Sequence, residues 1–229
     1  MTRPFDFSGL PRTPKDETAE LARRLERGEL PETVDAELFA RRNGRRLLAW
    51  HAAKGGCLPP RFVDEKLLDR KLDGERYVAN ALLERGALSE EHRERLMRHP
   101  EQRLRMALFG SLPSSAFSDG EFLDSRVGER TEVASEITGR IKVVEKGATM
   151  RMLAAASGTL PVELLEGRLG ERDSRGRTCA AYAASGGLLP LLGRETAEKW
   201  LMVRDDAGST VAHALAASSS PPGEYFGEE

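Results

Sequence analysis

Cysteines, large aromatic side chains and long apolar runs are all scarce in this sequence, and each scarcity excludes a class of protein. The two cysteines, Cys57 and Cys179, lie far apart, so neither a disulfide framework nor a zinc site is indicated. Aromatic residues make up 6% of the chain, too few for a thick hydrophobic core. No apolar run approaches the roughly 18 residues of a membrane span. The N-terminus is charged and proline-containing, unlike a signal peptide. We therefore expect a cytoplasmic protein without membrane contact.

The sequence also lacks the motifs on which common enzyme classes depend. It has no Gly-x-Ser-x-Gly nucleophile elbow and no phosphate loop ending in Gly-Lys-Ser or Gly-Lys-Thr. No two histidines lie at the three- or four-residue helical spacing of a metal site. Both cysteines lie beside small residues in helical segments, where a small buried side chain is the expected role. We therefore expect no enzyme activity, no cofactor and no metal.

What the sequence does contain is a recurring motif of glycine, one further residue, leucine and usually proline. Apart from one long gap, successive copies are about 30 residues apart, a period that predicts a stack of paired helices. Each glycine is expected to end a first helix in the left-handed conformation, and each proline to start a second helix. The copies begin at Gly28, Gly56, Gly86, Gly110, Gly158 and Gly187.

Polar turns separate the copies, and threonines follow the last two turns. Thr178 and Thr210 each precede an alanine-rich segment, so we expect their hydroxyls to cap helices. His213 lies one turn beyond Thr210, and we expect its imidazole to hydrogen-bond to that turn.

Residues 98–147 interrupt the repeat. Pro100 falls where the opening turn of a first helix is expected, so that helix is predicted to be short. Ile141, Val143 and Val144 favour an extended strand. We therefore expect an irregular layer here.

These patterns predict an all-α fold, a helical-repeat solenoid of helix-turn-helix layers over residues 13–217. The array would form two halves, 13–117 and 148–217, around the irregular middle. Residues 1–12 are expected to be a flexible arm, and residues 218–229, rich in serine, proline, glycine and acidic side chains, a disordered tail.

The best copies resemble the ankyrin repeat. Gly208-Ser209-Thr210-Val211-Ala212-His213 is similar to its turn-to-helix motif, with Val211 where the family prefers proline. Ala183-Ala184, followed by Gly187-Leu188, is similar to its alanine pair and the turn between its helices. The chain looks like one of the divergent ankyrin-like arrays of bacterial or phage proteins. The resemblance implies a protein-binding scaffold without chemistry of its own, which grips a partner by the inter-repeat turns and the concave face of the first helices.

Charge is distributed unevenly along the chain. Residues 1–115 contain 22 basic and 19 acidic side chains, and residues 116–229 contain 13 and 18, so the halves carry about +3 and −5. If stacking aligns the turns along one edge, the N-terminal half presents a basic strip. An ordinary solvated surface of paired arginines and glutamates is the alternative. The basic candidates are Arg41, Arg42, Arg45, Arg46, Arg70, Lys71, Arg76, Arg98, Arg103 and Arg105.

Trp50 is a further candidate for partner binding. Counted from Gly44, it falls at an exposed first-helix position and could anchor an interface. Counted back from Gly56, it falls at a buried position, and the alanines around it leave room for a large side chain.

These observations predict a non-catalytic scaffold or inhibitor that docks another protein with an acidic surface, for example by sterically blocking a host complex. The alternative is a nucleic-acid-binding protein that uses the same basic strip, although a net charge of −2 does not favour a general nucleic-acid binder. The oligomeric state is left open.

Overall fold

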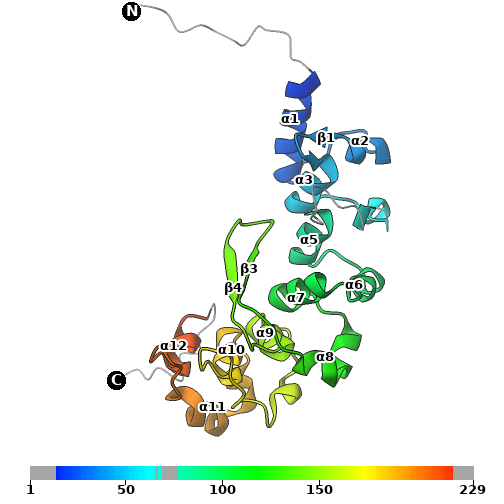
Figure 1. Ribbon diagram of the computed structural model, residues 1–229. Coiled ribbons are helices and arrows are strands. Elements are labelled where there is room, and N and C mark those ends of the chain that lie inside the picture. Colours follow the sequence, from blue (N-terminus) through cyan, green and yellow to red (C-terminus); the bar gives the residue numbers. More distant parts are fainter. Residues whose placement is uncertain (1–13, 65–66, 69–76, 219–229) are drawn as a thin grey trace, which may run out of the picture. The chain divides into compact units, whose positions relative to one another are not determined.

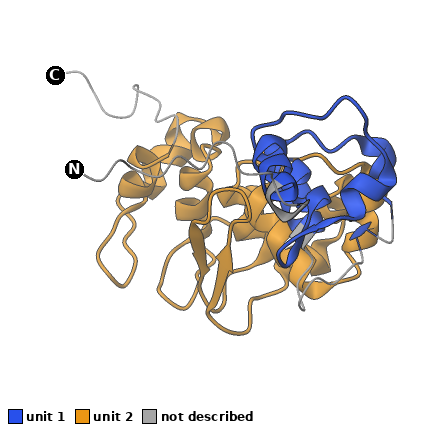
Figure 2. Ribbon diagram, turned by 90° about the horizontal axis from the view of Figure 1, so that it is seen from above, with its two compact units in different colours: residues 1–85 blue, residues 86–229 orange. Residues whose placement is uncertain are grey.

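The computed structural model describes residues 14–64, 67–68 and 77–218, and the chain divides into two compact units, 1–85 and 86–229 (Figure 2). The predicted arm, 1–12, and all but the first residue of the predicted tail, 218–229, lie outside the described residues. The boundary between the units lies between Arg85 and Gly86. Residues 98–147, where we expected the array to divide, lie within unit 2.

Unit 1 is built from helices and one short hairpin. Helix α3 packs against both α1 and α5, so the first helices follow one another in sequence order (Figure 1). The elements of unit 1 are α1 (Pro14–Glu26), α2 (Ala36–Ala40), β1 (Arg42–Asn43), β2 (Arg46–Leu47), α3 (Leu48–Gly55), the 3-10 helix η1 (Pro60–Phe62) and α5 (Tyr77–Glu84).

Unit 2 repeats this arrangement. Helix α9 packs against α7 and α10, and α10 packs in turn against α12 (Figure 1). The elements of unit 2 are α6 (Glu90–Leu96), α7 (Pro100–Phe109), η2 (Ser114–Ser118), α8 (Gly120–Asp124), β3 (Thr131–Ala134), β4 (Ile141–Val144), α9 (Met150–Ala156), η3 (Val162–Leu165), α10 (Cys179–Ser185), η4 (Leu189–Leu192), α11 (Arg194–Leu201) and α12 (Val211–Ala216).

The chain is mainly helical, as predicted, but it is not strictly all-α. Two antiparallel hairpins are present, β1–β2 and β3–β4. The strand predicted from Ile141, Val143 and Val144 is confirmed as β4. β-Branched side chains favour the extended backbone, and a turn with Gly139 at φ 68° joins this strand to β3.

The local signals for helix ends are confirmed. All six motif glycines have positive φ, between 64° at Gly86 and 85° at Gly28. The hydroxyls of Thr178 and Thr210 cap α10 and α12 by accepting hydrogen bonds from Ala181 N and His213 N. Thr149 caps α9 in the same way.

Two predictions about the helices are wrong. Pro100 does not shorten its helix: α7 begins at Pro100 and runs for ten residues, because proline is well tolerated in the first turn, where its missing N–H has no helical partner. The Leu-Pro motifs do not start second α-helices. Those at Pro161 and Pro190 lead first into η3 and η4, which end just before Gly167 and Gly193, both with positive φ. The α-helix α11 begins only after Gly193, at Arg194.

Consecutive first helices approach until their backbones touch. A Cβ atom added to Gly186 would lie 1.9 Å from the carbonyl oxygen of Ala155, and one added to Gly55 would lie 1.9 Å from that of Leu25. The core is correspondingly rich in alanine, as in Ala154 and Ala183, both fully buried. Small side chains thus allow thin layers to pack closely.

Candidate functional site

The predicted arginine cluster forms the β1–β2 hairpin of unit 1. The strands pair Arg42 with Leu47 and Asn43 with Arg46, and Gly44 supplies the left-handed turn residue at φ 61°. We call Arg41, Arg42, Arg45 and Arg46 the arginine hairpin. All four residues are exposed, so four positive charges lie on one short turn.

Three of these arginines carry unpaired charges within the part of unit 1 that the structure describes. No ion pair or side-chain hydrogen bond joins Arg41, Arg42 or Arg45 to another described residue. Some exposed arginines elsewhere are paired, for example Arg23 with Glu20 at 2.7 Å. The hairpin therefore presents guanidinium groups that are available to an external anion.

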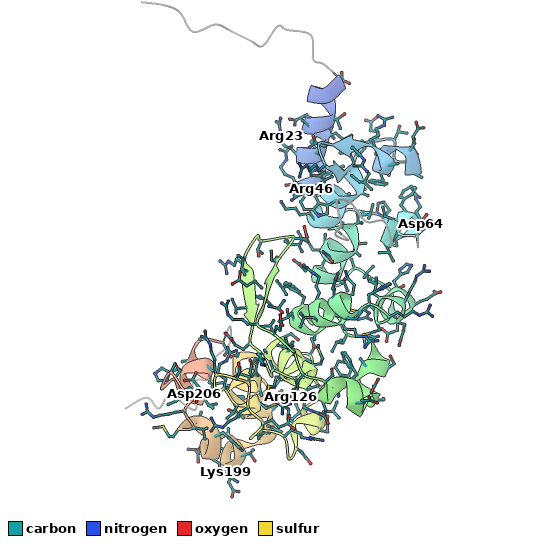
Figure 3. All side chains as sticks on the ribbon, in the orientation of Figure 1. Arg23, Arg46, Asp64, Arg126, Lys199 and Asp206 are labelled. Carbon is teal, nitrogen blue, oxygen red and sulfur yellow. The ribbon has the colours of Figure 1, made fainter. Side chains whose placement is uncertain are left out.

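The side chain of Arg46 stacks on the ring of Trp50. The guanidinium carbon of Arg46, labelled in Figure 3, lies 3.9 Å from the centroid of the Trp50 ring. Trp50 itself is only 1% exposed. It is therefore a core residue and not a surface anchor. Its part in the candidate site is to hold Arg46 against α3.

The other predicted basic residues do not all extend the hairpin. Arg70, Lys71 and Arg76 lie outside the described residues. Arg98 is exposed and belongs to unit 2. Arg103, also in unit 2, is partly buried and donates its Nε–H to the carbonyl oxygen of Met97, just beyond α6. Of the predicted basic strip, the structure therefore describes the arginine hairpin in unit 1 and further arginines in unit 2.

A partly buried polar cluster lies beside Trp50. His51 Nδ1 is 2.7 Å from Glu26 Oε1, and Lys54 Nζ is 3.1 Å from Glu26 Oε2, which ties α3 to α1. Burial lowers the pKa of His51 more than Glu26 raises it. Burial raises the pKa of Glu26, but hydrogen bonds from His51 and Lys54 outweigh it and leave that pKa below its usual value. The cluster is consistent with a neutral imidazole held by an ionised carboxylate.

The cysteines are not arranged as nucleophiles. Cys179 is fully buried, and burial raises the pKa of its thiol to about 12. Burial also raises the pKa of Cys57, whose Sγ donates to the carbonyl oxygen of Leu25 at 3.3 Å. Among the residues with described positions, no group of three His, Cys, Asp or Glu side chains could hold a metal ion.

Unit 2 contains a ladder of arginines, Arg126 and Arg172, that is not among the residues predicted from the sequence. Arg126 Nη1 donates to the carbonyl oxygens of Gly147, at 3.0 Å, and Arg172, at 3.2 Å. Arg172 Nη1 likewise donates to Gly176 and to Arg204, the latter at 3.2 Å. Each arginine thus bonds to its own turn and to the next one. The signal was present in the sequence, because Arg172 and Arg204 each stand six residues before a capping threonine.

Backbone hydrogen bonds join the same turns directly. Ser174 N donates to Lys146 O at 2.8 Å, and Asp206 N donates to Arg175 O at 3.0 Å. Figure 3 labels Arg126 and Asp206 at two of these turns. In unit 2, therefore, three successive turns lie side by side along one edge.

A groove of about 440 Å³ lies beside these turns, on α10 and α12. The side chains of Ala181 and Ala214 line it, together with the exposed His213. The Nδ1 atom of His213 accepts a hydrogen bond from Thr210 N at 3.1 Å, which confirms the contact predicted for this imidazole. The ring is thus fixed by the cap while its other edge faces solvent.

The sequence matches no family model and no curated protein. Within the described ranges, no helix combines the length and apolar character needed to cross a membrane.

Proposed function

We propose that this protein is a non-catalytic, ankyrin-like binding scaffold that holds an acidic surface of another protein through the arginine hairpin. The observation that carries the proposal is the set of three exposed guanidinium groups of Arg41, Arg42 and Arg45 on one short hairpin, none of which pairs with another described residue. Carboxylates are the natural partners of such groups, because the planar guanidinium forms two parallel hydrogen bonds with a carboxylate.

The scaffold part of the proposal draws support from repetition in unit 2. Three first helices, α9, α10 and α12, each begin at a capping threonine and pack in chain order. The turns before them are hydrogen-bonded to one another. Such repetition suits a solenoid, in which turns and first-helix faces are left for a partner. Steric inhibition of a larger complex is one use of such a surface, and we retain it as part of the proposal by analogy.

The test is to reverse three charges, with the triple variant Arg41→Glu, Arg42→Glu and Arg45→Glu. Arg46 is retained because it stacks on Trp50. Each exposed ion pair contributes up to about 1 kcal/mol, so loss of three is expected to weaken partner binding about 10- to 100-fold. The free energy of unfolding should change by less than about 0.5 kcal/mol, because the three side chains are exposed. Affinity capture from an extract of the source organism, followed by mass spectrometry, gives the partner set.

A matched control reverses the same number of charges elsewhere, at Arg23, Arg194 and Lys199, which are exposed. This variant should retain the partners that the hairpin variant loses. Nuclease treatment of the extract separates the alternative function: if capture depends on nucleic acid and falls steeply with salt, the strip binds phosphate and not protein. Equal capture by the wild type and the hairpin variant would exclude the arginine hairpin as a binding surface.

A further inference from the structure

The β3–β4 hairpin of unit 2 has two outer edges, one along β3 and one along β4, and a side chain from α7 contacts the β3 edge. The hairpin lies between Arg126 and Thr149, which bridge each other at its base, and it projects from the neighbouring helices (Figure 1). Arg105, on α7, donates to the carbonyl oxygen of Ala134 in β3 at 3.0 Å. The outer edge of β3 thus faces α7.

One face of the hairpin is also covered. Lys142 Nζ donates to the carbonyl oxygen of Leu108 at 2.8 Å and lies 4.4 Å from the centroid of the Phe109 ring. Val133, which pairs with Lys142, is buried, as is Val144. Because side chains alternate along a strand, Ile141 and Val143 occupy the opposite face. They are 59% and 41% exposed.

The pattern of hydrogen bonds between β3 and β4 shows which backbone groups of β4 point away from β3. Ser135 N donates to Arg140 O at 2.8 Å, so these residues form a hydrogen-bonded pair. Such pairs alternate with non-hydrogen-bonded pairs in an antiparallel ladder. Ile141 and Val143 therefore direct their N–H and C=O groups away from β3. Within the described chain, no hydrogen bond is made by these outward N–H and C=O groups.

The charges around this edge are mostly basic. Arg140, Lys142 and Lys146 are exposed along β4 and its ends. Glu145 is buried and paired with Arg175 at 3.2 Å, so its charge is offset. A second copy of β4 would bring the same basic residues alongside these, which opposes self-pairing.

We propose that the outer edge of β4 is a docking site for an extended, acidic segment of a partner protein, added as a third strand beside Ile141 and Val143. Main-chain hydrogen bonds would hold the added strand, and its apolar side chains would cover Ile141 and Val143. Its acidic side chains would meet Arg140 and Lys146, at the two ends of β4. This proposal concerns unit 2 alone and does not depend on the arginine hairpin of unit 1.

The test uses a short fluorescent peptide in which valine and isoleucine alternate with glutamate, titrated with the full chain and followed by anisotropy. Val143→Pro removes an outward N–H without breaking a β3–β4 hydrogen bond, and we expect it to weaken binding about tenfold. Glu132→Pro is the matched control: Glu132 pairs with Val143, so its N–H points to the β3 edge, and binding should be retained. The Arg41, Arg42 and Arg45 charge-reversal variant should bind the peptide like the wild type.

Two further peptides, titrated with the wild-type protein, separate the contribution of main-chain hydrogen bonds from that of charge. A peptide N-methylated at the amides that face β4 should not bind, and one with lysine in place of glutamate should bind about tenfold more weakly. The proposal is overturned if the glutamate peptide does not bind, or if the Val143→Pro and Glu132→Pro variants bind it equally tightly. It is also overturned if the lysine peptide binds as tightly as the glutamate peptide. A wild-type dimer in sedimentation that Val143→Pro dissociates would also overturn it, because a second copy would then occupy β4.

Discussion

At the scale of single residues, burial decides the chemistry more than residue type does. His51 and His213 are both histidines at helical positions, but His51 is buried against Glu26 whereas His213 is exposed and fixed to a helix cap. Arg103 and Arg45 differ in the same way, since one binds a backbone carbonyl and the other has no partner among the described residues. Counting charges in the sequence cannot separate these cases.

The His51–Glu26 pair predicts a pH dependence of stability for unit 1. The pKa of His51 is lowered on folding, so the unfolded state takes up a proton first as pH falls below about 6.5, and stability declines. The pKa of Glu26 is also lowered, so a second loss follows as pH falls below about 4.5. In a Trp200→Phe background, where Trp50 is the only tryptophan, urea denaturation monitored by fluorescence across this range should show both steps.

His51→Gln tests the origin of the first step, because glutamine can still hydrogen-bond to Glu26 but does not titrate. This variant should lose the decline just below neutral pH and keep the one at lower pH. If its pH profile matches that of the wild type, another group causes the first step.

At the scale of elements, glycines determine how closely neighbouring helices pack. Gly186 has an ordinary backbone conformation, with φ −87°, so an alanine there meets no conformational penalty. An added methyl group would nevertheless collide with the carbonyl oxygen of Ala155. We expect Gly186→Ala to destabilise unit 2 by about 1–3 kcal/mol or more, because α9 and α10 must move apart.

Gly120→Ala is the matched control in unit 2. No atom lies within 4 Å of a Cβ at Gly120, and the residue opens α8, so this change should be neutral or slightly stabilising. Urea denaturation followed by circular dichroism measures both variants. Equal stability of the two would show that the close approach of α9 and α10 is not required.

At the scale of the whole molecule, the two compact units each contain their own core. Trp50, Leu47 and Leu48 are fully buried in unit 1, and Met152 and Leu165 in unit 2. A unit with its own hydrophobic core can unfold by itself. The two tryptophans, Trp50 and Trp200, fall one in each unit, which makes this testable.

In a Trp200→Phe background, Trp50 is the only tryptophan and reports on unit 1. Gly55→Ala should lower the urea midpoint of its fluorescence transition, because the added Cβ would meet the carbonyl oxygen of Leu25. Gly186→Ala should leave that midpoint unchanged, since it acts within unit 2. Equal shifts from both substitutions would mean that the chain unfolds as one cooperative unit.

The sequence by itself determined the helix caps, the left-handed glycines and the strand β4. The hydroxyl of Thr178, the backbone of Gly158 and the branched side chain of Val143 act on neighbours within a few residues, so their effects can be read locally. Only the tertiary structure decided that Trp50 is buried, that Arg103 is engaged and that no further described strand pairs with the outer edge of β4. These outcomes depend on contacts with other parts of the fold: Lys142, for example, binds the carbonyl of Leu108, 34 residues away. Burial and pairing are properties of the folded chain, and no local pattern specifies them.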